Sequence, residues 1–385
     1  MRLRRLKLSN FRNIQDGAIE FPPGVSIIVG ANGAGKTSLL EAAMFACCGR
    51  SFRTRREQEM VQEKATFFRV EALVDWNGSQ LGRAVACERG SGAVIDSGGG
   101  PQWLPGGSTL CFSPDDLQLI KGPPAERRRF LDDAIGRQLP SYRRLLLDYQ
   151  KVMAQRNSFL QRARAGLVQL ADISPWDRQL ASLAVRIYRS RSDHCREIAP
   201  RFEESFREIS SDDARTDVRY VSQLEHLESG TDLEEKMVLA LAERWSEDLG
   251  RLSTGFGTHR DDVDFTLASR SLRAYGSQGE QRAAVLALLL ADRRMGIESG
   301  EPPLLLLDDV MSELDPERRR RLLNALAGNL DRGSSGYRPS SENNSPQTII
   351  TAADAGLFTD EELDGACVIE VASGALREAR AAMDG

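Results

Sequence analysis

Two short fragments that lie far apart in the chain constrain its fold most strongly. The first, residues 30–37, reads Gly-Ala-Asn-Gly-Ala-Gly-Lys-Thr and matches the complete G-x-x-x-x-G-K-T phosphate-binding loop. The second, residues 304–309, is a run of four leucines followed by two aspartates. Compact proteins with this loop place their Mg²⁺ carboxylate much closer to the loop lysine. We therefore expect a large insertion between the two halves of one nucleotide site.

The glycine-rich loop lies in the sequence context that its chemistry needs. An apolar β-branched run at 25–29 predicts a buried strand before it, and 38–48 predicts a helix after it. Glycines let backbone N–H groups converge on a phosphate, and the helix N-terminus adds its dipole. Lys36 is expected to reach the β- and γ-phosphates, and Thr37 to ligate Mg²⁺. The predicted nucleotide contacts in this loop are Gly30, Ala31, Asn32, Gly33, Ala34, Gly35, Lys36, Thr37 and Ser38.

The acidic pair ends a strand that is expected to be fully buried, because Leu304–Leu307 follows two prolines and carries no polar residue. Asp308 is predicted to hold Mg²⁺ through a water molecule, and Asp309 to orient or deprotonate the attacking water as a general base. A structural alternative for Asp309 is a helix cap.

A second set of motifs surrounds this strand. Ser277-Gln278-Gly279-Glu280-Gln281-Arg282 resembles the S-G-G-Q signature of ABC-type ATPases, and Ser277, Gln278 and Gly279 would cap the γ-phosphate held by another subunit. The alternative is a plain helix cap by Ser277. Residues 312–315 match the D-loop position and also predict a helix start with Pro316 in its first turn. No histidine occurs where transporters carry their switch histidine, so Thr351 or Asp354 is the candidate substitute.

Composition excludes several classes of protein. The chain has 385 residues, of which 41% are hydrophobic and 28% charged, with a net charge of −5 and a pI near 5.6. No apolar run is long enough to predict a membrane span, and the basic N-terminus lacks the apolar segment of a signal peptide. The six cysteines lack zinc-ligand spacing, which is typical of reduced thiols in a cytoplasmic protein.

The sequence predicts an α/β fold with a mixed sheet, interrupted by a mostly helical insert. We expect an N-terminal half of the ATPase domain at 1–122, a helical DNA- or partner-binding domain at 123–255, and a C-terminal half at 256–385. Helical periodicity dominates the middle segment, where Pro175 is expected to separate two long helices. A polar stretch at 333–347 predicts a disordered surface loop.

The insert is locally basic. Residues 121–200 contain 16 Lys and Arg against 8 Asp and Glu, an excess of eight in an acidic chain. Phosphate contacts supply most non-specific affinity for DNA, so Arg143, Arg144 and Lys151 are candidate DNA ligands. Two structural alternatives that involve no DNA remain open. The charges could form a solvated helical face, or Arg127–Arg129 could pair with the neighbouring Asp132 and Asp133.

Taken together, the motifs resemble the RecF family of bacterial recombination mediators, nearly from end to end. The resemblance rests on 8–13 (Leu-Ser-Asn-Phe-Arg-Asn), 51–54 (Ser-Phe-Arg-Thr), 112–132 with its Glu-Arg-Arg-Arg-Phe-Leu-Asp run, 257–262 (Gly-Thr-His-Arg-Asp-Asp) and 306–315. Two positions depart from the family pattern. Thr258 replaces the usual proline, and Glu280 replaces the glutamine usual in ABC signatures.

This resemblance implies an ABC-type ATPase head that forms an ATP-dependent homodimer and binds gapped or junction DNA. It implies partnership with RecR and RecO, loading of RecA on single strands, and a location in the cytoplasm at the nucleoid. It also places Asn10 and Arg12 near the nucleotide. ATP and Mg²⁺ are the expected cofactors, and hydrolysis should be slow, DNA-stimulated and used as a switch. The alternative function is the ATPase subunit of an ABC-type transporter.

Overall fold

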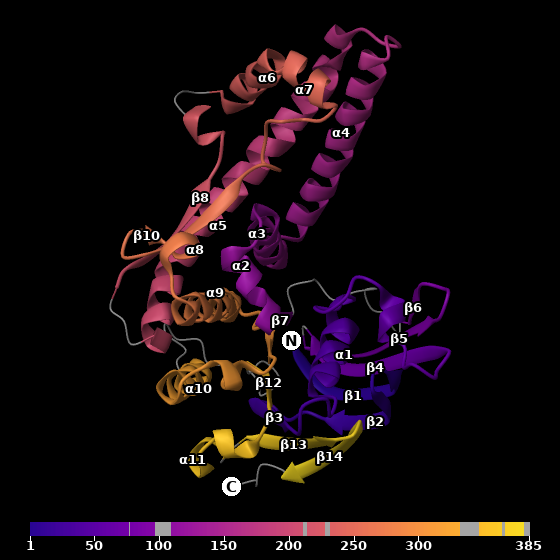
Figure 1. The fold of residues 1–385 in the computed structure, drawn as a ribbon, viewed down its shortest axis with the longest axis vertical. Helices are drawn as coiled ribbons and strands as arrows, with labels where there is room; N and C mark the ends of the chain where they lie inside the picture. The colour runs from indigo at the N-terminus through magenta and orange to yellow at the C-terminus, as the bar shows by residue number, and fades with distance from the viewer. Residues whose placement is uncertain are drawn as a thin grey trace. The chain divides into compact units, whose positions relative to one another are not determined.

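The computed structural model describes residues 1–76, 78–96, 109–210, 214–227, 232–331, 346–363 and 366–380. The chain divides into two compact units (Figure 1). The first unit combines residues 1–117, 204–213 and 278–385, and the second combines 118–203 and 214–277. The boundaries therefore differ from those expected from sequence, since residues 256–277 group with the inserted unit.

A six-stranded sheet forms the centre of the first unit, with the strand order β14-β13-β3-β12-β11-β7. Five of its strands run parallel, and β14 alone pairs antiparallel, with β13. The strands are β3 (Val25–Val29), β7 (Thr109–Phe112), β11 (Leu304–Leu307), β12 (Thr348–Ala352), β13 (Cys367–Ala372) and β14 (Ala375–Arg380). The expected mixed sheet is confirmed.

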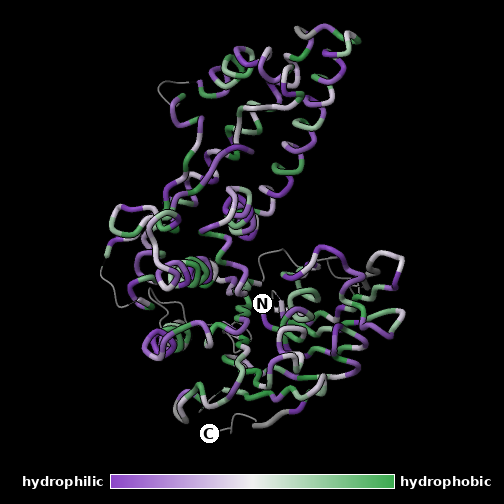
Figure 2. The backbone as a smooth tube through the Cα atoms, viewed as in Figure 1, coloured by the Kyte–Doolittle hydropathy of each residue, from purple (hydrophilic) through white to green (hydrophobic). Residues whose placement is uncertain are grey.

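Burial on both faces explains the apolar runs of these strands. Every residue of β11 and of β12 is buried, and the hydrophobic colour in Figure 2 gathers on the strands of this sheet. The helix α9 (Gln278–Glu298) is buried along much of its length, and α10 (Pro316–Asp331) follows β11. Parallel order brings the carboxyl ends of β3, β11 and β12 to one edge of the sheet, where the glycine-rich loop and the acidic pair both lie.

A second, antiparallel sheet completes the first unit, in the order β2-β1-β4-β5-β6. Its strands are β1 (Arg2–Phe11), β2 (Ile14–Glu20), β4 (Phe67–Trp76), β5 (Ser79–Glu88) and β6 (Ala93–Asp96). The inward side chains of β1 and β4 join one hydrophobic core with the helix α1 (Lys36–Cys48) and with leucines of β11. This core fixes α1, and therefore the loop that precedes it.

The second unit is helical but contains a small sheet. Its main helices are α3 (Pro124–Gln138), α4 (Pro140–Arg164), α5 (Ser174–Ser210, whose last turns group with the first unit), α6 (Leu233–Glu243) and α7 (Trp245–Arg251). The three-stranded sheet has the order β10-β9-β8, formed by β8 (Thr216–Val221), β9 (Asp262–Leu267) and β10 (Arg270–Ser271).

Three buried arginines hold the second unit together through long-range ion pairs. Arg156 contacts Asp177 and Asp248, each at 2.7 Å. Arg191 pairs with Asp132 at 2.9 Å, and Arg127 pairs with Asp262 at 2.6 Å. The alternative that Arg127 pairs with Asp132 does not hold, because Arg127 bonds to Asp262 and Arg191 bonds to Asp132. These three cations contribute to the local excess of positive charge but do not lie on a surface that could meet DNA.

The motif at residues 257–262 is a structural hub of the same unit. The carbonyl of Thr258 accepts a hydrogen bond from Arg191 at 2.8 Å, and His259 Nδ1 lies 2.8 Å from the hydroxyl of Tyr149. Tyr220 donates to Asp261. The motif thus ties α4, α5 and β8 to one loop.

One local expectation needs correction. The expected helical insert contains the strand β8. β1 continues through Phe11, and only two residues separate it from β2. Residues 333–345 of the polar stretch lie outside the described residues. Gln347 at its end is buried and bonds to the backbone of Leu3. Among the described helices, none combines the length and the apolar sequence needed to span a bilayer.

Candidate nucleotide-binding site

The glycine-rich loop turns sharply between β3 and α1, and two of its glycines are sterically required. A Cβ added to Gly30 would lie 2.2 Å from the carbonyl oxygen of Val371. Gly35 adopts a φ of +120° directly before α1, which strains any other residue. The side chain of Lys36 lies back over the loop and donates to the carbonyls of Gly30 at 2.7 Å and Ala31 at 3.1 Å. Its ammonium group is thus held where an incoming phosphate chain would compete for it.

Two threonine hydroxyls converge on Asp308 at the end of β11. Thr37 donates to Asp308 Oδ1 at 3.0 Å, and Thr351 donates to the same oxygen at 2.8 Å. Burial raises the pKa of Asp308, and these two hydrogen bonds oppose the rise. The structure therefore joins residues from three distant parts of the chain around one carboxylate.

Asp309 has a strained backbone and an unsatisfied carboxylate oxygen. Its φ is +49°, in the left-handed region that few residues other than glycine adopt. The backbone N–H of Asp309 donates to Thr351 Oγ1 at 2.8 Å, so one hydroxyl serves both acidic residues. Asp309 Oδ1 is buried with no hydrogen-bond partner among the described residues. The side chain caps no helix, which removes the main structural alternative for this aspartate.

The oxygens of Thr37 and Asp308 fit a magnesium ion. Octahedral Mg²⁺ with oxygens at about 2.1 Å places neighbouring ligands about 3 Å apart, which matches the 3.0 Å between Thr37 Oγ1 and Asp308 Oδ1. No group of three or more His, Cys, Asp or Glu residues in the described part of the chain could hold a metal by itself. A two-residue set is typical of Mg²⁺ that takes its remaining ligands from phosphates and water.

A cavity of about 710 Å³ opens beside this centre and is lined by polar and charged residues. Arg12 lines it and forms two bonds to Glu41, at 2.9 and 2.7 Å. Glu41 is fully buried in α1 and also accepts from Ser51 and Arg53. This carboxylate therefore orients two arginines that line the cavity. The remaining lining residues are Asn13, Asn32, Gly33, Gly35, Lys36, Thr37, Ser38, Glu59, Val61, Glu63 and Asp309.

Asn10 does not line this cavity, contrary to the expectation. It lies at the end of β1, where its carbonyl accepts from the N–H of Gln62. Asn13 takes the expected place instead, because it donates to the Gly33 carbonyl at 2.9 Å and accepts from Ser38 at 2.8 Å. Asn13, Glu41 and Arg53 were not singled out as site residues from sequence. Glu41 could have been recognised from sequence, because it is the lone carboxylate in the otherwise apolar helix α1.

The signature motif opens α9, which begins at Gln278. Ser277 is the last residue of the second unit, and Gln278 and Gly279 belong to the first. Arg318 of α10 covers Gly279 so closely that an added Cβ would lie 2.6 Å from its Nη1. Arg282 pairs with Glu313 of the D-loop segment. Within the first unit, the signature is therefore linked to the D-loop that follows the acidic pair.

The three candidate DNA ligands lie on α4 with different surroundings. Arg143 is half-buried and donates to the carbonyl of Gly136 at 3.2 Å. Arg144 is exposed and pairs with Asp148 at 3.1 Å. Lys151 is exposed and has no ion-pair partner among the described residues. Arg144 and Lys151 are therefore available at the surface, and Arg143 only in part.

The sequence of this chain is similar to family models and to proteins of known family. An AAA-domain model matches residues 5–86, and a second AAA-domain model, whose description also names an AbiEii toxin of a type IV toxin–antitoxin system, matches 100–351. The DNA replication and repair protein RecF of Heliobacterium modesticaldum is 36% identical over 98% of this chain and 99% of its own. RecF of Symbiobacterium thermophilum is 38% identical over 85% of this chain and 88% of its own.

Solved structures agree with these relatives. The chain is similar to the recombination mediator RecF with ATP, of the RecFOR pathway, with a TM-score of 0.82, 28% identity and coverage of 98% of this chain and 97% of that one. An Smc head bound to the winged-helix domain of ScpA has a TM-score of 0.58 at 15% identity, covering 100% and 98%, and supports the fold alone. Full-length similarity of this kind excludes the transporter alternative. The chain belongs to the RecF family of DNA replication and repair proteins.

Proposed function

We propose that the chain is an ATP-dependent DNA-binding recombination mediator whose two copies close on ATP. The observation that carries the proposal is the convergence of Lys36, Thr37 and the acidic pair at one edge of the parallel sheet, beside a cavity lined by both cations and carboxylates. It is supported by full-length membership of a family that includes an ATP-bound relative.

Binding of ATP follows from the groups on the loop. The N-terminus of α1 presents backbone N–H groups and a positive dipole to the phosphate chain. When ATP binds, the Lys36 ammonium group donates to phosphate oxygens in place of the Gly30 and Ala31 carbonyls. Arg12 and Arg53 face the same cavity. Thr37 and Asp308 would hold Mg²⁺, which when bound would neutralise charge on the phosphates.

Hydrolysis depends on Asp309 and on a second copy of the chain. Asp309 orients a water molecule for in-line attack on the γ-phosphorus and accepts its proton, while the bond from that phosphorus to the bridging oxygen breaks and ADP leaves. The hydrogen bond from the Asp309 N–H to Thr351 holds that aspartate in place. Ser277 and the first turn of α9 act in trans on the γ-phosphate of the partner copy. Since each site is incomplete in a single copy, turnover is slow and serves as a switch that DNA stimulates.

DNA contact is assigned to the basic face of α4 in the inserted unit. Arg144 and Lys151 offer exposed cations for phosphate oxygens, with Arg143 as a partly buried neighbour. The preferred substrate is gapped duplex or a junction of single and double strands, at the nucleoid in the cytoplasm. RecR and RecO are the proposed partners, and together the three promote loading of RecA on single strands. A relative's assignment to the RecFOR pathway supports this part.

The experiment that tests the DNA assignment compares two charge-reversal triples by fluorescence anisotropy on a gapped duplex, with ATP and Mg²⁺, across a salt series. The first triple changes Arg143, Arg144 and Lys151 to glutamate, and the control changes three exposed arginines elsewhere, Arg178, Arg215 and Arg320. We expect only the first triple to weaken binding and to flatten the dependence of log K on log salt, because each lost phosphate contact removes about 0.9 from that slope. Equal loss in both triples would mean that net charge, not this face, governs binding.

A further inference from the structure

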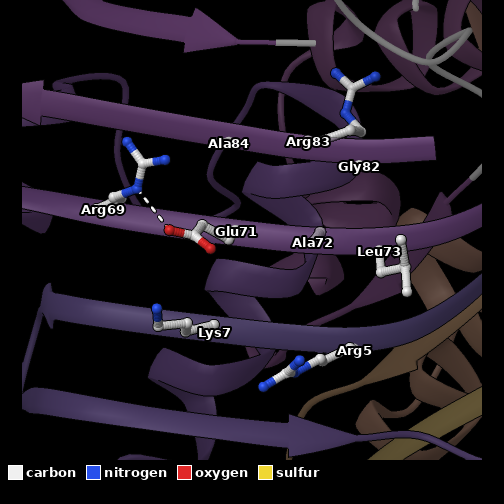
Figure 3. A pocket seen from close by; sticks show the side chains of 9 residues that line it. All are labelled: Arg5, Lys7, Arg69, Glu71, Ala72, Leu73, Gly82, Arg83 and Ala84. Carbon is white, nitrogen blue, oxygen red and sulfur yellow. Dashed lines mark hydrogen bonds and ion pairs between the residues drawn. The ribbon is translucent and has the colours of Figure 1, made fainter. Parts of the chain in front are cut away.

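The outward face of the antiparallel sheet in the first unit carries a hollow of about 470 Å³ (Figure 3). Side chains alternate along each strand, so Arg5 and Lys7 of β1 point outward while Leu6 and Leu8 are buried in the core. The hollow crosses β1, β4 and β5, and it shares no lining residue with the nucleotide cavity. We name it the sheet trough, lined by Arg5, Lys7, Arg69, Glu71, Ala72, Leu73, Gly82, Arg83 and Ala84.

Cations recur in the sheet trough at each step along the strands. The register places Arg5 opposite Leu73, Lys7 opposite Glu71, and Ser9 opposite Arg69. Three successive outward rows therefore carry one cation each, and the rows are two residues, or about 7 Å, apart. These cations form a positive ladder with one step per row, and each row also holds one carboxylate, Glu20 or Asp16 on β2 and Glu71 on β4. Such a spacing of cations suits a chain that carries one negative charge per unit.

These charges are only partly neutralised. Arg69 bonds to Glu71 at 2.7 Å, but in the part of the chain that the structure describes neither the Arg5 nor the Lys7 side chain has a hydrogen-bond or ion-pair partner. The pKa of Glu71 is lowered, first by its bond to Arg69 and then by the charges of Lys7 and Arg5. Within the lining of the trough, the three outward cations therefore outnumber the single carboxylate of Glu71.

The floor of the trough leaves room for an occupant. β5 contributes Gly82 and Ala84, and a Cβ added to Gly82 would meet no atom within 4 Å. Leu73 adds an apolar side chain on the strand next to Arg5, at one end of the hollow (Figure 3). Arg83 lies mostly beneath the sheet, where its Nε donates to the carbonyl of Ala46 at 3.1 Å.

Acidic side chains limit the width of the occupant. Asp16 and Glu20 are exposed on β2, directly beside the strand that carries Arg5 and Lys7. They border the positive ladder on one side and would repel a broad anionic surface. The favourable track is about as wide as the three strands β1, β4 and β5, or roughly 10 Å.

We propose that the sheet trough seats one phosphodiester backbone of DNA, as a contact surface separate from α4. Arg5, Lys7 and Arg69 would each meet a phosphate, and Gly82 and Ala84 would let the backbone approach the sheet. Contacts of this kind position DNA without reading its sequence. The inference rests on the proposed DNA-binding function and adds a second surface to it.

The test uses the full-length chain with ATP, Mg²⁺ and gapped duplex DNA, in a salt series read by fluorescence anisotropy. The double variant Arg5→Gln with Lys7→Gln should reduce the slope of log K against log salt by about 2, and should lower affinity about 10- to 50-fold at 0.15 M salt. Exposed strand positions of this kind leave the core intact, and an unchanged ATP-dependent mass would verify that the variant folds and dimerises.

A pair of variants at one position provides the matched control. Gly82→Glu and Gly82→Lys place opposite charges on the open floor, and Gly92→Glu places the same carboxylate at another open glycine outside the trough. We expect weaker binding for Gly82→Glu, equal or tighter binding for Gly82→Lys, and wild-type binding for Gly92→Glu.

Three outcomes would overturn the inference. One is a wild-type salt slope in the Arg5 and Lys7 double variant, and another is identical binding by the two Gly82 variants. The third is displacement of DNA from the trough by polyglutamate as readily as by an oligonucleotide of equal charge, which would reassign it to acidic polypeptides. If the α4 triple abolishes binding while trough variants bind normally, only the trough assignment fails. If the wild-type chain binds no DNA, the proposed function fails as well.

Discussion

Replacement of Thr351 by valine removes a single hydroxyl from the end of β12 and affects both acidic residues. Thr351 is fully buried, donates to Asp308 at 2.8 Å and accepts from the N–H of Asp309 at 2.8 Å. Valine has nearly the same shape, so no large cavity forms. The substitution therefore tests the effect of the two hydrogen bonds separately from the effect of packing.

The expected cost follows from those two bonds. A hydrogen bond to a charged carboxylate contributes about 1.5–3 kcal/mol, and a buried N–H left without a partner costs about 1–3 kcal/mol. Since both belong to one network, we expect a total loss of about 3 kcal/mol in the free energy of unfolding. In a unit of this size, each 1 kcal/mol lowers Tm by about 2–4 °C, which gives a fall of about 6–12 °C.

The catalytic effect should be larger than the effect on binding. Asp309 loses the bond that fixes its strained backbone, and misplacement of a catalytic group by about 1 Å costs on the order of 10²-fold in rate. ATP affinity should change less, because Lys36 and the loop are untouched and Asp308 keeps its hydrogen bond to Thr37. Single-turnover hydrolysis and a fluorescent nucleotide titration separate the two quantities.

Thr351→Ser is the matched control, since serine keeps the hydroxyl and loses only a methyl group. We expect Thr351→Ser to restore most of the hydrolysis rate. Hydrolysis at the wild-type rate in Thr351→Val would refute the positioning role, even if Tm fell.

Four further changes test other parts of the account. Lys36→Met should abolish tight nucleotide binding in a titration, because the loop loses its only mobile cation; retained affinity would contradict the phosphate role. Asp309→Asn should bind ATP and hydrolyse it at least about 10²-fold more slowly, and normal turnover would remove Asp309 as the base. Ser277→Arg should bind ATP yet stay monomeric by light scattering; normal dimerisation would exclude the trans contact. Burial, followed by the charges of Arg137 and Arg201, lowers the pKa of His194 from 6.5 to about 4. The unfolded chain therefore takes up this proton first, and stability should fall by up to about 3 kcal/mol between pH 6.5 and 4. His194→Asn should lose that dependence in acid unfolding curves, and an unchanged curve would show that another group titrates.

Local patterns predicted the elements that carry the nucleotide site. The strand at Val25–Val29 and the strand at Leu304–Leu307 have the expected bounds, because a short apolar run between breakers leaves few alternatives. The loop and the acidic pair meet because each follows a parallel strand. The carboxyl ends of parallel strands lie at one edge of the sheet.

Contacts between distant residues could not be predicted from such patterns. Arg127 pairs with a residue 135 positions away, although two aspartates lie within six positions of it in the sequence. The strand β8 of the insert pairs with β9, although a helical segment separates them in the sequence. No local sequence pattern predicts that pairing. Asn10 was placed in the site by resemblance alone, whereas the turn that follows β1 brings Asn13 to the loop.

The measurement that tests the central claim most directly is the light-scattering mass of the chain with ADP and with ATP, each with and without gapped duplex DNA. The account predicts a 42.6 kDa monomer with ADP and a dimer with ATP, and it predicts that DNA stabilises the dimer. A monomer under all four conditions would contradict the shared site, and the mechanism would then have to operate within one copy of the chain.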